Sequence, residues 1–249
     1  MTKIKLFCFP YAGGSTVIFN QWKKYLDTLI ELKPIELAGR GKRILEPLYK
    51  DVPDIIEDVF NQIKDDINKC PYALFGHSMG GMISYELTQK IQRDKLPGPI
   101  HVFFSGRNAP HVKREDDKIY HLMPEEEFKK EVINLGGTPP EFFDNPELLE
   151  VFLPLLKNDF KLAEKDLFNG EILPLDCNIS VLLGKEEDLI PEQCDGWKKH
   201  TKGLCSIHHF NGGHFFIHDE TEQITRLINN TLLGDIYISQ NSKYEVMRY

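Results

Sequence analysis

Three kinds of side chain in this sequence have the types and the order needed for nucleophilic catalysis. Ser78 lies in a G-x-S-x-G pattern at residues 76–80, an acidic run follows at 186–188, and His214 comes later. A serine hydroxyl becomes a useful nucleophile when a histidine removes its proton and a carboxylate orients that histidine. The order serine, acid, histidine therefore predicts a hydrolase that forms an acyl-enzyme on Ser78.

The residues around Ser78 predict a strand, a sharp turn and a helix. Residues 72–75 are an apolar run, and residues 79–93 carry apolar side chains near helical spacing. Such a turn forces the serine into a strained backbone conformation, so Gly76 and Gly80 are expected where a β-carbon would clash. The alternative is a chance glycine-serine turn, but the flanking strand and helix favour a nucleophile at a helix N-terminus.

His214 is the best base among nine histidines. It follows two glycines after the last predicted strand and precedes two phenylalanines that would shield it. The nearby His208, His209 and His218 raise a metal site as an alternative. No cysteine or carboxylate spacing completes a ligand set, so we expect no metal.

The acid is left open between two neighbours, Glu187 and Asp188. Aspartate is the commoner orienting residue, and either side chain is long enough to reach the histidine. Both residues therefore remain candidates at this point.

A glycine-rich turn at residues 10–15 follows the first predicted strand, residues 5–9. It is either a plain strand-to-helix connection or a loop that offers a backbone N–H to an oxyanion. In the second case the donors are the N–H groups of Ala12 and of Met79, the residue after the nucleophile. Arg40, after the second predicted strand, is either a solvated loop charge or a residue that orients a loop near the site.

Strand and helix patterns alternate along most of the chain, which predicts an α/β fold with a parallel sheet and helices on both faces. The order serine, acid, histidine is the one used on α/β-hydrolase scaffolds. Predicted strands cover residues 5–9, 32–37, 72–75, 99–104, 178–183 and 205–210. Residues 1–107 and 175–235 would form this core, with a last helix at about 220–233 and a mobile tail at 236–249.

Residues 108–174 interrupt this alternation. They contain apolar helical patterns at 124–135, 145–156 and 158–168 but no convincing strand. Extra helical packing at one edge would explain the segment. A helical lid with an acyl-binding inner face is favoured, because it enters at the strand ends where α/β sites open.

Composition restricts the possible partners and the location. The chain has 249 residues and a net charge of −8, which argues against a nucleic-acid surface. No apolar run is long enough for a membrane span. Five scattered cysteines, and an N-terminus that enters a strand directly, predict a cytoplasmic protein with free thiols.

Taken together, these motifs resemble those of the type II thioesterases, the stand-alone editing hydrolases of nonribosomal peptide and polyketide synthetases. The segments that carry the resemblance are F-P-Y-A-G-G at 9–14, E-L-A-G-R-G at 36–41, G-H-S-M-G-G at 76–81, L-G-G-T-P at 135–139, G-W at 196–197 and G-G-H-F at 212–215. The G-x-S-x-G turn is common to many hydrolases, whereas the combination of these segments is far more specific. The resemblance covers residues 4–233.

The resemblance implies an α/β-hydrolase core with a mobile helical lid, acting as a monomer. It implies hydrolysis of acyl groups stalled on the 4′-phosphopantetheine arm of carrier-protein domains, without a cofactor of the enzyme's own. Ser78 would be the nucleophile and His214 the base, with Ala12 and Met79 as oxyanion donors. The family's acid, usually aspartate, sits three residues after the strand-end glycine. Here that position is Glu187, and Asp188 follows, so both are kept.

Two other functions compete with this interpretation. A carboxylesterase or lipase for small soluble esters would use the same serine, histidine and acid. A carrier-binding scaffold with a degenerate site would use none of them, and the intact Ser78 and His214 argue against it.

Overall fold

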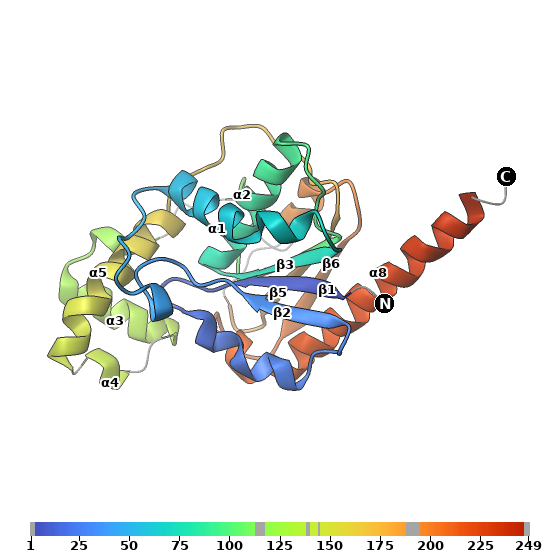
Figure 1. Ribbon diagram of the computed structural model, residues 1–249. Coiled ribbons are helices and arrows are strands. Elements are labelled where there is room, and N and C mark those ends of the chain that lie inside the picture. Colours follow the sequence, from blue (N-terminus) through green and yellow to red (C-terminus); the bar gives the residue numbers. More distant parts are fainter. Residues whose placement is uncertain (1–2, 113–117, 138–139, 144, 188–194, 247–249) are drawn as a thin grey trace.

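A six-stranded, wholly parallel sheet forms the centre of the protein in a computed structural model (Figure 1). The structure describes residues 3–112, 118–137, 140–143, 145–187 and 195–246. The strand order is β2-β1-β3-β4-β5-β6. The strands are β1 (Ile4–Phe9), β2 (Ile30–Pro34), β3 (Tyr72–His77), β4 (His101–Ser105), β5 (Asn178–Gly184) and β6 (Cys205–Phe210). The predicted α/β architecture is confirmed.

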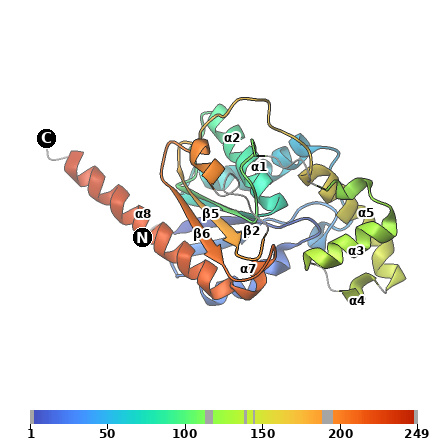
Figure 2. The same ribbon diagram turned by 180° about the vertical axis from the view of Figure 1, so that it is seen from behind.

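Helices cover both faces of the sheet, because the strands are apolar on both sides (Figures 1 and 2). Helices α1 (Val52–Ile67) and α2 (Met79–Arg93) pack on one face. The 3-10 helix η1 (Thr16–Lys24) and helix α8 (Thr221–Val246) pack on the other. Side chains of β1 alternate between two apolar cores, with Phe7 in one and Leu6 in the other.

Helix α1 shows how local sequence sets these elements. The Asp51 side chain accepts a hydrogen bond from the Asp54 N–H at 3.0 Å, and Pro53 occupies the first turn, where proline is tolerated. Ile55, Val59 and Ile63 are fully buried along one face. The helix predicted there is confirmed.

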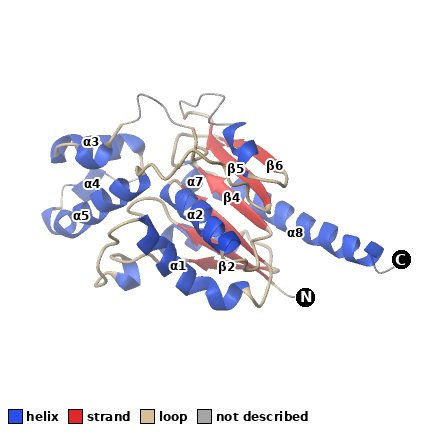
Figure 3. Cartoon of the chain, turned by 90° about the horizontal axis from the view of Figure 1, so that it is seen from above, coloured by secondary structure: helices blue, strands red, loops and turns tan. Residues whose placement is uncertain are grey.

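Residues between β4 and β5 form helices that lie beside the sheet at one end of the molecule (Figure 3). They comprise η3 (Tyr120–Leu122), α3 (Glu125–Leu135), α4 (Pro140–Phe143) and α5 (Pro146–Ala163). The sequence suggested two helices where α5 is one, continuous through Pro154. Leu155, Leu156 and Leu162, buried on its inner side, hold the helix together despite the missing proline N–H.

Other boundaries differ from the sequence prediction. Strand β2 begins at Ile30 rather than residue 32, because Ile30 pairs with Ile4 of β1. The helix expected to end near Leu233 runs to Val246, since no proline or further glycine follows Gly234 to stop it. Its last turns project away from the body (Figures 1 and 2). The remaining short elements are η2 (Gly41–Arg43), η4 (Gly196–His200) and α7 (Phe216–Asp219).

Candidate active site

Ser78 lies on a strained turn between β3 and α2. Its φ is 54° and its ψ is −111°, a conformation that non-glycine residues rarely adopt. Its N–H donates to the Ser105 carbonyl at 2.8 Å, which holds the turn against β4. A β-carbon at Gly76 would overlap the carbonyl of Gly80, so the sequence-based reason for a glycine there is confirmed.

His214 and Glu187 come from neighbouring loops at the ends of β5 and β6. His214 Nδ1 lies 3.1 Å from Glu187 Oε2. The other oxygen, Oε1, accepts a hydrogen bond from the N–H of Gly184 at 2.8 Å, which fixes the carboxylate. A carboxylate accepts hydrogen bonds and does not donate them, so this contact favours the tautomer of His214 with its proton on Nδ1, in which Nε2 can accept a proton. Asp188, the other candidate acid, lies outside the described residues.

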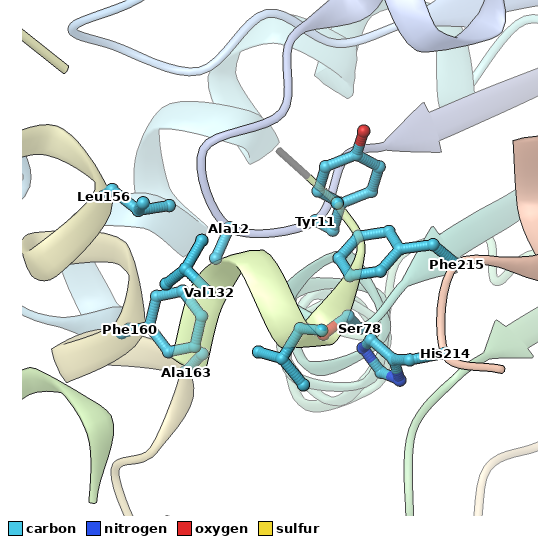
Figure 4. Close-up of a pocket in the computed structure, with 11 residues that line it drawn as sticks. Tyr11, Ala12, Ser78, Val132, Leu156, Phe160, Ala163, His214 and Phe215 are labelled. Carbon is cyan, nitrogen blue, oxygen red and sulfur yellow. The ribbon is translucent and has the colours of Figure 1, made fainter. Parts of the chain in front are cut away.

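Ser78 and His214 line one small cavity of about 60 Å³ (Figure 4). The core contributes Tyr11, Ala12 and Phe215 to its wall. The helices between β4 and β5 contribute the rest of the lining: Val132, Leu135, Gly137, Leu156, Phe160 and Ala163. A hydroxyl and an imidazole therefore face a largely apolar space, which suits an acyl group beside a nucleophile.

One of the two predicted oxyanion donors lines this cavity, and the other is the neighbour of Ser78 in the chain. Ala12 is in the turn after β1 and lines the cavity, whereas Met79 is the first residue of α2, next to Ser78. The first N–H groups of a helix have no partner within the helix, so the Met79 N–H is available to a ligand. The turn at residues 10–14 lies close to α2, since a β-carbon at Gly80 would overlap the Phe9 carbonyl.

His77 is buried behind the site and is not placed as the base. Its Nδ1 lies 2.8 Å from Ser105 Oγ, and its ring centre is 5.3 Å from that of His214. Burial, with a smaller effect of His214, holds the pKa of His77 well below 6.5. A neutral His77 adds no positive charge next to His214.

Sequence reasoning missed one acidic residue near the site. Asp159, on α5, is almost completely buried and forms a bidentate ion pair with Arg40. Of the two alternatives for Arg40, the solvated loop charge is therefore wrong. The available signal was an aspartate on the same helical face as the buried Leu155, Leu156 and Leu162.

The described residues contain no group of three or more His, Cys, Asp or Glu side chains arranged to hold a metal ion. None of the helices in the described part of the chain combines the length and the apolar character that crossing a membrane requires.

The parallel sheet, the strained serine turn and the order serine, acid, histidine define an α/β hydrolase. A profile of the Thioesterase domain matches residues 4–232. The chain therefore belongs to the thioesterase family, and the prediction of a thioester hydrolase is confirmed.

Several individual proteins and solved structures are similar to this chain. The chain is 37% identical over 234 residues to "Linear gramicidin dehydrogenase LgrE" of Brevibacillus parabrevis, covering 92% of this chain and 88% of that protein. It resembles the crystal structure of ClbQ from the colibactin NRPS/PKS pathway, with a TM-score of 0.87 and 33% identity over 95% of this chain and 100% of that one. It also resembles the type II thioesterase BorB from the borrelidin cluster, with a TM-score of 0.80 and 29% identity over 91% of each chain.

Proposed function

We propose that this thioesterase hydrolyses stalled or mis-primed acyl and aminoacyl groups on the 4′-phosphopantetheine arm of carrier-protein domains in nonribosomal peptide or polyketide biosynthesis. The observation that carries the proposal is the 3.1 Å contact between Glu187 and His214, with His214 and Ser78 facing one apolar cavity. The similarity to ClbQ and BorB supports the substrate class.

The reaction begins when Ser78 Oγ attacks the thioester carbonyl carbon while His214 Nε2 takes the hydroxyl proton. The N–H groups of Ala12 and Met79 stabilise the negative oxygen of the tetrahedral intermediate. The carbon–sulfur bond then breaks, and the imidazolium returns its proton to the departing pantetheine sulfur. This leaves an acyl ester on Ser78 and a free carrier thiol.

Deacylation repeats these steps with water. His214 Nε2 removes a proton from water, the hydroxide attacks the acyl ester, and the proton returns to Ser78 Oγ as the carboxylic acid leaves. Glu187 keeps the Nδ1 proton in place and stabilises the imidazolium in both halves of the reaction.

The helices between β4 and β5 act as the lid in this proposal. Gly137 lies so close to the Phe215 ring that a β-carbon there would overlap it, and Phe215 adjoins His214. Substrate entry therefore requires α3 and Gly137 to move away from Phe215. The enzyme would work as a cytoplasmic monomer, with a carrier protein as its transient partner.

The test is hydrolysis of an acetyl-loaded carrier protein, followed by intact-mass spectrometry. Wild type should release the acetyl group and leave the free pantetheine thiol, whereas Ser78→Ala should leave the carrier loaded. If wild type leaves the carrier loaded but cleaves 4-nitrophenyl acetate, the substrate proposal is wrong and the protein is an esterase for small molecules.

A further inference from the structure

The turn at residues 10–14, which carries the proposed oxyanion donor Ala12, is enclosed between two helices. On one side Gly80 of α2 approaches so closely that a β-carbon there would be 2.9 Å from the Pro10 carbonyl oxygen. On the other, a β-carbon at Gly13 would be 2.6 Å from Leu156 Cδ1 on α5. The conformation of the turn therefore depends on where α5 lies.

A buried ion pair joins α5 to this turn. Arg40 Nη1 and Nη2 donate to Asp159 Oδ2 and Oδ1 at 2.7 and 2.9 Å. Only 3% of Arg40 and 1% of Asp159 is exposed to solvent. Because the ion pair is buried away from solvent and bidentate, its geometry is held much more tightly than that of a surface ion pair.

Both members of the pair also hold the backbone next to Ala12. Asp159 Oδ2 accepts a hydrogen bond from the Gly13 N–H at 2.7 Å. Arg40 Nη1 donates to the Gly14 carbonyl oxygen at 3.1 Å. Gly13 has a φ of +76°, which lets the chain present its N–H to α5 just after Ala12. These two contacts fix the orientation of the peptide groups that follow Ala12.

We infer that Asp159 and Arg40 are positioning residues that hold the Ala12 N–H in the oxyanion hole and link it to α5. The inference rests on the proposed function of Ala12. Neither side chain touches the reacting atoms, so both act through the turn. Their loss should reduce stabilisation of the tetrahedral intermediate more than binding of the substrate.

The decisive variant is Asp159→Asn, which keeps the size of the side chain but removes its charge. We expect kcat for 4-nitrophenyl acetate to fall at least about tenfold with KM within about twofold, because a displaced oxyanion donor acts on the transition state. Phenylboronic acid, which forms a tetrahedral adduct with a serine, should inhibit the variant more weakly by a similar factor.

Asp58→Asn is the matched control. Asp58 forms a bidentate pair with Arg43 at 2.7 and 2.9 Å, and its other partners are Tyr49 and Gln62. This variant should lower the melting temperature yet leave kcat and inhibition by phenylboronic acid within about twofold of wild type.

Arg40→Lys tests the pair without removing the charge, and it covers the case in which Asp159→Asn does not fold. Lysine cannot form the bidentate contact that Arg40 makes with Asp159, so kcat should again fall with little change in KM. If a folded variant of either residue keeps wild-type kcat and boronate inhibition, the pair is only structural and the inference is wrong. The ester assay needs no carrier protein, so failure of wild type to unload a carrier would refute the proposed substrate separately.

Discussion

Replacing Glu187 with glutamine tests the proposed catalytic acid most directly. Gly184 donates its N–H to Oε1 of Glu187, while Oε2 lies 3.1 Å from His214 Nδ1. In Glu187→Gln the amide oxygen stays at the Oε1 position, because only the oxygen accepts from Gly184. The amide NH₂ then faces Nδ1 and favours the tautomer with its proton on Nε2, which cannot accept the proton of Ser78.

The size of the effect follows from this change of tautomer. An aspartate-to-asparagine change at the orienting position of a serine protease lowers kcat about 10⁴-fold through the same loss. That factor corresponds to about 5 kcal/mol of transition-state stabilisation. We therefore expect kcat of Glu187→Gln to fall by about 10³ to 10⁴, with little change in stability, since glutamine fills the same space.

The assay is turnover of an acetyl-loaded carrier protein, with Asp188→Asn as the control for the adjacent carboxylate. Asp188→Asn should keep kcat within about tenfold of wild type. If Asp188→Asn instead loses about 10³-fold while Glu187→Gln remains active, Asp188 is the acid and the reasoning from the Glu187–His214 contact is refuted.

Three further predictions concern the cavity, the response to acid and the serine turn. Leu156→Ala should widen the cavity and raise the octanoyl-to-acetyl ratio of kcat/KM by about tenfold, measured with acyl-pantetheine thioesters. Burial, with smaller effects of His111 and Lys199, lowers the pKa of His200 from 6.5 to about 4. Below pH 6.5 the unfolded chain therefore binds a proton at His200 that the native state does not bind. The contribution of His200 to the free energy of unfolding should fall by about 2 kcal/mol from pH 7 to pH 5, measured by urea unfolding of wild type against a His200 variant. Gly76→Ala should lower the melting temperature by about 6 °C or more, because its β-carbon overlaps the Gly80 carbonyl.

Each of these predictions has a clear contrary result. An unchanged octanoyl-to-acetyl ratio would show that Leu156 does not limit the acyl chain. His200→Gln is the control for acid, since its loss of stability between pH 7 and pH 5 should be smaller by about 2 kcal/mol, and an equal loss would exclude His200 as the cause. A Gly76→Ala protein that melts like wild type would show that the turn can relax.

The sequence by itself determined the features that depend on neighbouring residues. The serine turn could be predicted from the sequence because the strand, the two glycines and the helix that it requires all lie within a few residues of Ser78. The parallel sheet followed from alternating strand and helix patterns, and α1 from its cap and apolar stripe. Motifs of this kind, including the glycine-rich turn at residues 10–14, also carried the resemblance to type II thioesterases.

Only the tertiary structure decided which distant side chains meet. Glu187 was distinguished by its contacts with Gly184 and His214, which depend on β5 and β6 pairing side by side. Arg40 and Asp159 are 119 positions apart, and their contact depends on how α5 packs against the sheet. Periodicity shows which face of a helix is buried but not which group it meets there, because packing partners are chosen by the whole fold rather than by local sequence.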